Sequence, residues 1–284
     1  MPKKFPQWLK RRIPCGSERT SEILSGFDLN TVCVSANCPN KGECFSKSEA
    51  TFMILGSICS RSCRFCSVKK GIPLPVDDNE PERIVQAIRK MGLKFVVITS
   101  VTRDDLDDGG GGHFAKTVKT LRQNFGKKIG IELLIPDLNG NIDALKIILN
   151  EDIDVLNHNV ETVERLYSSV RPQADYKRSL FMIKEVKKIK PGIFTKSGLM
   201  LGLGESESET KQVISDIRKS DCDFLTLGQY LKPEKISVEI SEFITPEKFD
   251  NYRKYAMDLG FKNVASGPFV RSSYNAGSFF KDSQ

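Results

Sequence analysis

The chain has 284 residues, of which 39% are hydrophobic and 28% charged, and this length is enough to bury a large core in one domain. Lys and Arg total 43 and Asp and Glu total 36, so the formal net charge is +7, a mild excess that favours acidic over basic macromolecular partners. No stretch approaches the roughly 18 apolar residues of a membrane-spanning helix, and residues 1–14 lack the apolar run of a secretory signal. We therefore expect a cytoplasmic protein, where thiols stay reduced and clustered cysteines indicate metal more than disulfides.

Residues 1–50 are rich in Pro, Asn, Ser and Gly and are predicted to form an irregular N-terminal extension. From residue 51 onward, short apolar runs of strand character alternate with amphipathic segments of helical character. The predicted strands span residues 51–55, 95–99, 129–135, 154–157, 195–201 and 224–227. The predicted helices span residues 82–91, 114–125, 142–149, 180–186, 207–219 and 246–259. This alternation implies parallel strands joined by right-handed helical crossovers, in one barrel-like or doubly wound domain.

Six of the eight cysteines lie between residues 33 and 66, in two triplets with different spacings. The first triplet has the pattern CxxxxCxxxxxC and the second CxxxCxxC; their members are Cys33, Cys38 and Cys44, and Cys59, Cys63 and Cys66. Each triplet is one ligand short of a closed four-thiolate site, so an iron with an open, reactive position is expected. The second triplet directly follows the predicted strand 51–55, at the end of the sheet where α/β proteins bind their ligands.

Three other interpretations of these cysteines are weaker. The second triplet has the i, i+4, i+7 spacing of an apolar helix face, but Arg61 and Arg64 interrupt it and Gly56 lies just ahead. Disulfides do not suit a reducing compartment. A nucleic-acid module with two zinc sites predicts closed four-ligand sites and interleaved basic and aromatic residues, and the sequence shows neither. Cys222 stands alone before an apolar run and is predicted to be a core thiol.

At the second triplet the sequence resembles the radical S-adenosylmethionine superfamily. Phe65, directly before Cys66, matches the aromatic residue that the superfamily usually carries there. The resemblance implies a [4Fe-4S] cluster on the three cysteines, whose open iron chelates the amino and carboxylate groups of S-adenosylmethionine. An electron from the reduced cluster then cleaves the sulfonium to a 5′-deoxyadenosyl radical. With only two histidines, the chain suits a radical mechanism better than histidine acid-base catalysis.

The resemblance narrows to the lipoyl synthase family and covers nearly the whole chain. The matching segments are residues 50–68, 97–117, 156–172, 195–205, 225–233 and 265–277. The first triplet is similar to the auxiliary-cluster motif of that family, and the resemblance implies a fourth ligand from a serine of the RSSY motif, here residues 271–274. Ser273 is the expected ligand and Ser272 the alternative; otherwise the Ser272 hydroxyl is expected to satisfy only local backbone groups. Arg271 is expected to brace this cluster by pairing with a carboxylate.

The resemblance also implies a fold, an activity and cofactors. The fold is α/β, a partial (β/α)6 barrel of the radical SAM type over residues 51–260, with extensions at residues 1–50 and 261–284 that carry the first triplet and the RSSY motif. The activity is that of a sulfurtransferase, which inserts two sulfur atoms at carbons 6 and 8 of a protein-bound octanoyl-lysine. The cofactors are two [4Fe-4S] clusters and S-adenosylmethionine, with the auxiliary cluster as the sulfur source. The alternative is another sulfur-inserting radical enzyme similar to biotin synthase, against which the first triplet and the RSSY motif argue.

Partners follow from the same resemblance. They are octanoylated lipoyl carrier domains of 2-oxoacid dehydrogenases or the glycine cleavage H protein, an electron donor such as ferredoxin or flavodoxin, and iron-sulfur assembly proteins, with neither nucleic acid nor membrane. Further candidates for binding S-adenosylmethionine are Phe65, Asn157, Glu161, Arg171, Gly202 and Gly204. The two glycines are expected to let the backbone approach the adenosine, although glycine in a strand also marks a bulge. The polar residues after the predicted strand 154–157 are alternatively a solvated helix start.

Overall fold

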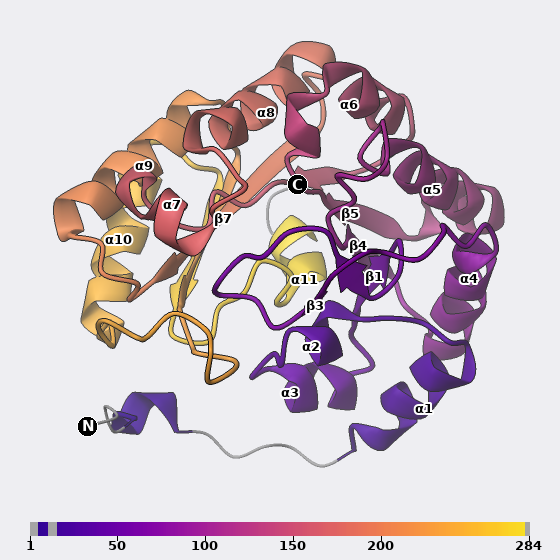
Figure 1. Ribbon diagram of the computed structural model, residues 1–284, viewed down its shortest axis with the longest axis horizontal. Coiled ribbons are helices and arrows are strands. Elements are labelled where there is room, and N and C mark those ends of the chain that lie inside the picture. The colour runs from indigo at the N-terminus through magenta and orange to yellow at the C-terminus, as the bar shows by residue number, and fades with distance from the viewer. Residues whose placement is uncertain (1–4, 11–15, 282–284) are drawn as a thin grey trace.

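A seven-stranded, all-parallel sheet forms the centre of the molecule (Figure 1). The computed structural model describes residues 5–10 and 16–281. Along the sheet the strands are β1 (Thr51–Ile54), β4 (Phe95–Ser100), β5 (Gly130–Leu134), β6 (Val155–Asn157), β7 (Phe194–Leu201), β8 (Phe224–Gln229) and β9 (Asn263–Gly267). The sheet curves into an open barrel whose edges are β1 and β9. Within the described ranges no helix is long and apolar enough to cross a membrane.

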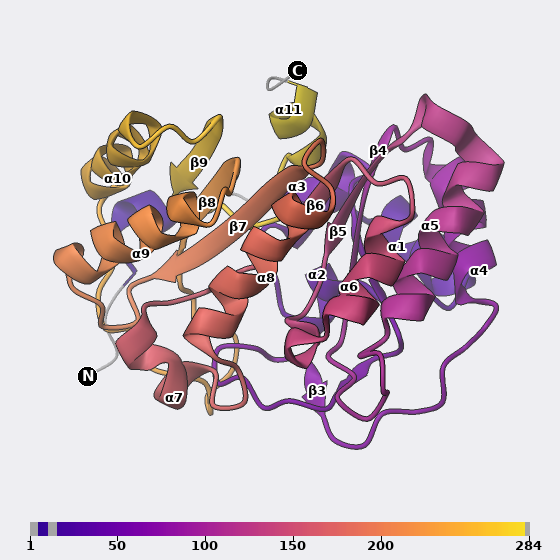
Figure 2. The same ribbon diagram turned by 90° about the horizontal axis from the view of Figure 1, so that it is seen from above.

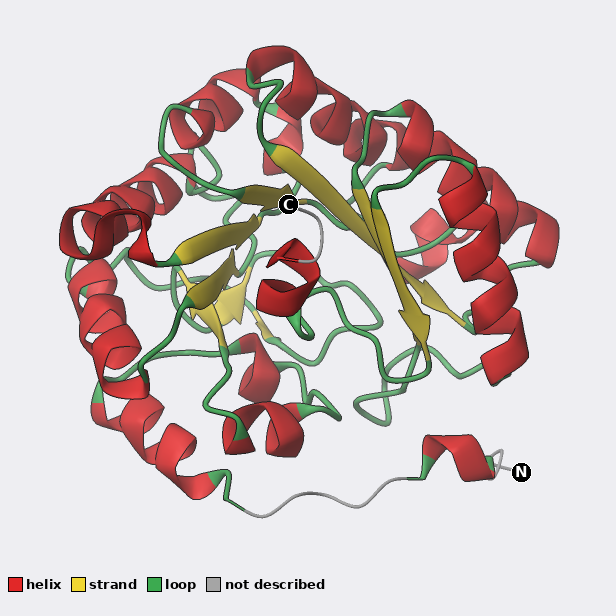
Figure 3. Ribbon diagram, turned by 180° about the vertical axis from the view of Figure 1, so that it is seen from behind, coloured by secondary structure: helices red, strands yellow, loops and turns green. Residues whose placement is uncertain are grey.

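Helices cover the outer face of the curved sheet (Figures 1 and 3). They are α4 (Glu80–Met91), α5 (Gly111–Phe125), α6 (Ile142–Leu149), α8 (Tyr176–Ile189), α9 (Glu207–Lys219) and α10 (Pro246–Asp258). The short helix α7 (Tyr167–Val170) lies in the connection between β6 and α8, where the Val170 carbonyl accepts from the backbone N–H of Arg64 at 2.9 Å. Side-chain caps fix where several of them begin: Asp175 caps α8, Thr245 caps α10, and Ser206 with Glu209 forms a capping box on α9. These three helices therefore have a defined start, and the apolar sides of the covering helices face the sheet.

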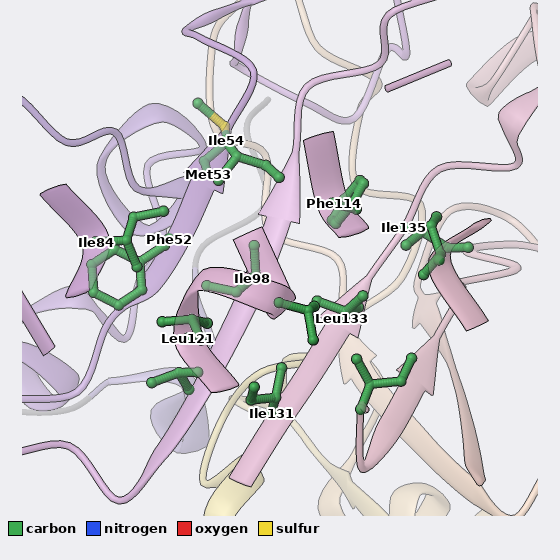
Figure 4. Close-up of a cluster of buried hydrophobic side chains, with 14 of the residues drawn as sticks. Phe52, Met53, Ile54, Ile84, Ile98, Phe114, Leu121, Ile131, Leu133 and Ile135 are labelled. Carbon is green, nitrogen blue, oxygen red and sulfur yellow. The ribbon is translucent and has the colours of Figure 1, made fainter. Parts of the chain in front are cut away.

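The larger hydrophobic core lies between the first strands and the helices that cover them (Figure 4). Phe52 and Ile54 of β1 are at most 1% exposed, and so are Ile98 of β4 and Leu133 of β5. Both faces of these strands are buried, one under the helices and one inside the barrel, which explains their nearly continuous apolar runs. The prediction of an α/β fold with a parallel sheet is confirmed.

Two features differ from the sequence prediction. A seventh parallel strand, β9, lies beyond the predicted end of the core at residue 260, where its small polar residues (NVASG) carry no strong strand pattern. Residues 16–50 are not irregular but contain α1 (Glu18–Gly26), α2 (Val32–Ser35) and α3 (Lys41–Ser46). The last two helices are only one or two turns long, too short for a hydrophobic period to appear in the sequence.

The C-terminal helix α11 (Ala276–Lys281) plugs the barrel at the end where the strands begin, opposite β3 (Lys69–Lys70) in Figure 2. Phe280 packs on Phe95, the first residue of β4, with ring centroids 5.5 Å apart, and Phe279 packs edge-on to Phe224 of β8 at 5.5 Å. Above this aromatic floor, Lys196 and Glu132 form a buried ion pair at 3.0 Å. The plug leaves the opposite end of the barrel as the open one.

Candidate functional site

A cavity of about 980 Å³ lies inside the barrel toward the carboxyl ends of the strands. Its walls come from segments far apart in the sequence: the N-terminal extension, the loops after β1, β4, β5 and β6, and a C-terminal segment of residues 269–274. We call this segment the C-terminal strap. The predicted site residues that line the cavity are Cys33, Cys38, Cys44, Cys59, Cys63, Phe65, Cys66, Glu161, Arg171 and Ser273. The fold therefore brings both cysteine triplets and the RSSY motif to one chamber.

The second triplet lies in a loop that leaves β1 through a left-handed turn at Leu55 and Gly56. Cys59 belongs to the short strand β2 (Ile58–Cys59), and its sulfur accepts hydrogen bonds from the backbone N–H groups of Arg61 at 3.5 Å and Thr102 at 3.4 Å. Cys63 and Cys66 follow in irregular backbone, as predicted. These two N–H donors hold the Cys59 sulfur in place on the wall of the cavity.

Arg61 holds this loop against the ends of the neighbouring strands. Its guanidinium is almost fully buried, and it pairs with Asp104 at 2.6 Å and with Asp137 at 2.8 Å. Asp104 follows β4 and Asp137 follows β5, so one side chain ties three strand ends together. The pairing with Arg61 holds the pKa of the Asp137 carboxyl below its usual range despite its burial. The loop with the second triplet is therefore a rigid part of the barrel rim.

The segment that carries the first triplet packs along β1, an edge strand of the sheet. Cys33 lies in α2 and Cys44 in α3, with Cys38 in the turn between them. The backbone N–H of Met53 donates to the carbonyl of Asn30 at 2.9 Å, which joins this segment to the strand. The N-terminal extension thereby covers the open side of the barrel and turns its cysteines inward.

The thiols of both triplets fit a cluster better than a nucleophilic role. Burial, reinforced by neighbouring cysteines, raises the pKa of Cys33 to about 11 and the pKa of Cys44 to about 12. Burial likewise raises the pKa of Cys66 to about 12. Such thiols stay neutral and unreactive until a metal centre displaces their protons. In residues 5–10 and 16–281 no three ligating side chains converge on one point as a single ion requires, and a four-iron cluster spreads its ligands further than one zinc ion does.

The C-terminal strap lies between β8 and the first triplet. On the triplet's side, the Asn40 amide donates to the Phe269 carbonyl at 2.7 Å, and the Tyr274 hydroxyl donates to Glu43 of α3 at 2.8 Å. On the barrel side, a Cβ on Gly228 would meet the Val270 carbonyl oxygen at 2.1 Å, so only glycine lets the strap pack this closely on β8. The strap therefore closes the chamber over the first triplet.

The two serines of the strap differ in what their hydroxyls do. The Ser272 hydroxyl donates to the side-chain oxygen of Asn159 at 2.7 Å, across 113 residues of sequence. The expectation that Ser272 satisfies only local backbone groups is therefore wrong. The Ser273 hydroxyl, by contrast, makes no hydrogen bond with any described residue, and Ser273 lines the cavity.

Glu161 and Arg171 form the charged wall of the cavity after β6. Glu161 has a left-handed backbone (φ 71°), and its peptide groups bond to Gly198 and Met200 of β7 at 2.9 and 2.8 Å. Burial raises the pKa of the Glu161 carboxyl, and the Arg171 cation opposes that rise. Backbone strain of this kind persists only where the surrounding structure imposes it, and it concentrates at functional sites.

Three predicted residues do not line the cavity. Asn157 is buried below it and donates to Glu132 at 2.9 Å. Gly202 and Gly204 form a tight turn after β7, with φ angles of 96° and 111°. A Cβ at Gly202 would collide with Gln229 and with the Glu242 carbonyl at 2.3 Å, so this glycine serves close packing.

Two cavity residues were missed in the sequence, Asn159 and His158. Asn159 accepts from Ser272 and donates to Glu161 at 3.1 Å, so it lies at the centre of the polar wall. Its position two residues after Asn157, on the same side of an extended segment, is the signal that points to it. Burial and the nearby Arg171 cation lower the pKa of His158 to about 4, so this imidazole is neutral near pH 7.

Residues 53–217, more than half of the chain, match the family model of the Radical SAM superfamily. Among solved structures, methylornithine synthase has the same fold with a TM-score of 0.58 at 14% sequence identity, over 75% of this chain and 69% of that one. The chain is thus a radical SAM protein.

Curated relatives define its place within that class. The chain is 54% identical to the lipoyl synthase of Caldanaerobacter subterraneus subsp. tengcongensis over 272 aligned residues, and this alignment covers 95% of each chain. It is 52% identical over 278 residues to the lipoyl synthase of Alkaliphilus metalliredigens, over 96% of this chain and 95% of that one. The chain belongs to the lipoyl synthase family.

Proposed function

We infer that the chain is a lipoyl synthase, which inserts two sulfur atoms at carbons 6 and 8 of a protein-bound octanoyl-lysine with the help of S-adenosylmethionine and [4Fe-4S] clusters. The observation that supports this function most directly is that both cysteine triplets and the strap line one cavity. Methylene and methyl hydrogens of an octanoyl chain are beyond the reach of any side-chain base at neutral pH, so hydrogen-atom abstraction is the remaining route. Dithiolane formation on an octanoyl-lysine peptide tests this function.

We assign separate roles to the two triplets. When bound, the cluster on Cys59, Cys63 and Cys66 supplies the electron that cleaves S-adenosylmethionine, and the cluster on the first triplet supplies the sulfur. For the fourth ligand of the auxiliary cluster we choose Ser273 over Ser272, because the Ser273 hydroxyl lines the cavity with no other partner among the described residues, whereas the Ser272 hydroxyl is committed to Asn159.

The wall around Asn159, Glu161 and Arg171 is the proposed site for the polar groups of S-adenosylmethionine. The Glu161 carboxylate suits ribose hydroxyls, and the Arg171 cation suits a carboxylate. Phe65 lines the cavity between Cys63 and Cys66 and offers an apolar surface beside the cluster. Asn157, Gly202 and Gly204 do not line the cavity, so we assign them no direct contact with S-adenosylmethionine. Loss of S-adenosylmethionine affinity in Glu161→Gln, with iron content unchanged, is the expected sign of a direct contact.

We propose that the core, residues 51–260, and the two extensions have different functions. The core provides the barrel and the second triplet, and the two extensions together build the auxiliary side through the contacts Asn40 to Phe269 and Tyr274 to Glu43. Asn40→Ala combined with Tyr274→Phe removes these contacts and leaves β9 and α11 in place; this variant should lose auxiliary-cluster iron while the core still binds the other cluster, which iron analysis would measure.

The substrate is an octanoylated carrier protein. We propose that this carrier is a lipoyl domain of a 2-oxoacid dehydrogenase or the glycine cleavage H protein, that ferredoxin or flavodoxin supplies the electron, and that iron-sulfur assembly proteins load the clusters in the cytoplasm. We assign no role to nucleic acid or membranes. Activity with a purified ferredoxin or flavodoxin in place of a chemical reductant tests the electron donor.

A basic and apolar rim beside the cavity is the proposed docking face for the carrier. Lys70 lines the cavity, and within the described ranges neither Lys69 nor Lys70 has a carboxylate within 4 Å. The next residues expose apolar side chains, Ile72 by 90% and Leu74 by 68%, on a loop that Pro73 and Pro75 stiffen. A stiff loop that displays apolar groups beside unpaired cations suits an acidic protein surface.

Reversing both charges, in Lys69→Glu with Lys70→Glu, is expected to raise the KM for the octanoylated carrier protein about three- to tenfold at low salt. The KM for a short octanoyl-lysine peptide should rise less, because only Lys70 of the two lysines lines the cavity that the peptide enters. Lys177→Glu with Lys184→Glu on α8 is the matched control. An equal rise for peptide and carrier would contradict docking at this face.

Ser273→Cys is expected to assemble both clusters, yet to lower turnover, because a thiolate holds iron more firmly than a hydroxyl and resists opening of the cluster. Ser273→Ala should lose sulfur transfer and keep S-adenosylmethionine cleavage. Ser266→Ala is the control, since that hydroxyl only donates to the Phe249 carbonyl at 2.8 Å, outside the cavity. Wild-type sulfur insertion by Ser273→Ala would disprove the ligand assignment.

A further inference from the structure

The hydroxyl of Ser272 joins two parts of the cavity that the proposed function treats as separate sites. Ser272 belongs to the strap, directly before the proposed cluster ligand Ser273. Asn159, its hydrogen-bond acceptor, follows β6 and belongs to the wall assigned to S-adenosylmethionine. The Asn159 amide continues the chain by donating to Glu161 at 3.1 Å. A continuous path of hydrogen bonds thus runs from the strap to the charged wall.

Each link of this path has few alternatives. Asn159 offers one carbonyl oxygen and one amide nitrogen; the oxygen accepts from Ser272 and the nitrogen donates to Glu161, so the two contacts together fix the orientation of the amide. The backbone N–H and carbonyl of Glu161 both form hydrogen bonds with β7, which fixes the position of this residue. Any shift of the strap away from Asn159 therefore frees the amide to rotate and loosens its hold on the Glu161 carboxylate.

The neighbouring strand leaves room for this contact and for little else. A Cβ at Gly198 would lie 2.9 Å from both the Asn159 oxygen and the Ser272 hydroxyl, and 2.6 Å from the Thr226 hydroxyl. Real Cβ atoms essentially never lie this close to other atoms, so the absence of a side chain at residue 198 is what allows the strap and the wall to meet.

We propose that Ser272 is a positioning residue that couples the S-adenosylmethionine wall to the strap that carries Ser273. With the hydrogen bond formed, Asn159 and Glu161 are preorganised for the cofactor and Ser273 is held over the first triplet. Coupling between two sites is reciprocal: if the strap favours cofactor binding, cofactor binding favours the docked strap by the same factor. The inference rests on the proposed function, because it takes residues 159–171 as the cofactor wall.

The test measures S-adenosylmethionine affinity and strap dynamics in the holoenzyme, neither of which depends on turnover. Ser272→Ala is expected to bind S-adenosylmethionine about three- to tenfold more weakly than wild type, the effect of one lost hydrogen bond, with both clusters retained. In wild type, S-adenosylmethionine should slow amide hydrogen exchange in residues 269–274, and this slowing should disappear in Ser272→Ala. Ser266→Ala, a serine of β9 outside the cavity, should behave as wild type in both measurements.

Wild-type affinity in Ser272→Ala would overturn the coupling, and so would weaker affinity with the strap still protected by the cofactor, because the hydroxyl would then act on the wall alone. These outcomes leave the proposed function intact. A wild-type holoenzyme that fails to bind S-adenosylmethionine would instead remove the proposed function, and the coupling with it.

Discussion

Replacing Cys59, Cys63 and Cys66 together with Ala is expected to abolish S-adenosylmethionine cleavage. Loss of a single hydrogen-bond partner of a metal ligand already lowers metal affinity roughly 10–100-fold. Removal of all three ligands should therefore lower the affinity for the cluster by at least this factor. About half of the bound iron should remain, on the first triplet. The measurements are iron content and 5′-deoxyadenosine formation under anaerobic, reducing conditions.

Cys222→Ala is the matched control for this variant. Cys222 is fully buried just before β8, donates to the Phe224 carbonyl and does not line the cavity, as its predicted role as a core thiol requires. Its loss should cost on the order of 1 kcal/mol of stability and leave iron content and cleavage intact. Cleavage that survives the triple substitution would show that the radical chemistry is not based on the second triplet.

Replacing Cys33, Cys38 and Cys44 with Ala is expected to separate the two halves of the reaction. The second triplet keeps its own support, from Arg61 and from the N–H donors to Cys59, none of which belongs to the N-terminal extension. Formation of 5′-deoxyadenosine should therefore continue, while the octanoyl chain receives no sulfur. Chromatography of the nucleoside and mass spectrometry of the acyl peptide measure the two halves independently.

Dithiolane product from this variant would exclude the first triplet as the sulfur source. Loss of both cleavage and insertion would instead show that the two sites are not independent, contrary to the separate attachment of each triplet to the barrel.

The parallel α/β fold was predictable because its strands are buried on both faces and their apolar runs are strong. The predicted strands 51–55, 95–99 and 224–227 end within two residues of the observed ends of β1, β4 and β8. The strand β9 was not predictable in this way, since NVASG owes its place to pairing with β8 rather than to its own hydrophobicity. The short helices α2 and α3 likewise depend on contacts with β1 and the strap.

The cysteines of the site were predictable because their spacing is written in the sequence, whereas the polar wall was only partly so. Glu161 and Arg171 reach the cavity as expected, and Asn157 does not, because it points below the cavity to Glu132 while Asn159 points into it. The contact between Ser272 and Asn159 spans the sheet and has no sequence signal. The room that Gly198 leaves for it becomes visible only when β7, β8 and the strap are placed together.

The central claim is that one cavity combines radical generation with sulfur donation. Mass spectrometry of an octanoyl-lysine peptide, after anaerobic incubation with the cluster-loaded protein, S-adenosylmethionine and a reductant, tests it most directly. We predict conversion of the octanoyl group to the dithiolane, with two sulfur atoms added and 5′-deoxyadenosine formed. Cleavage of S-adenosylmethionine with the octanoyl peptide left unchanged would contradict the claim.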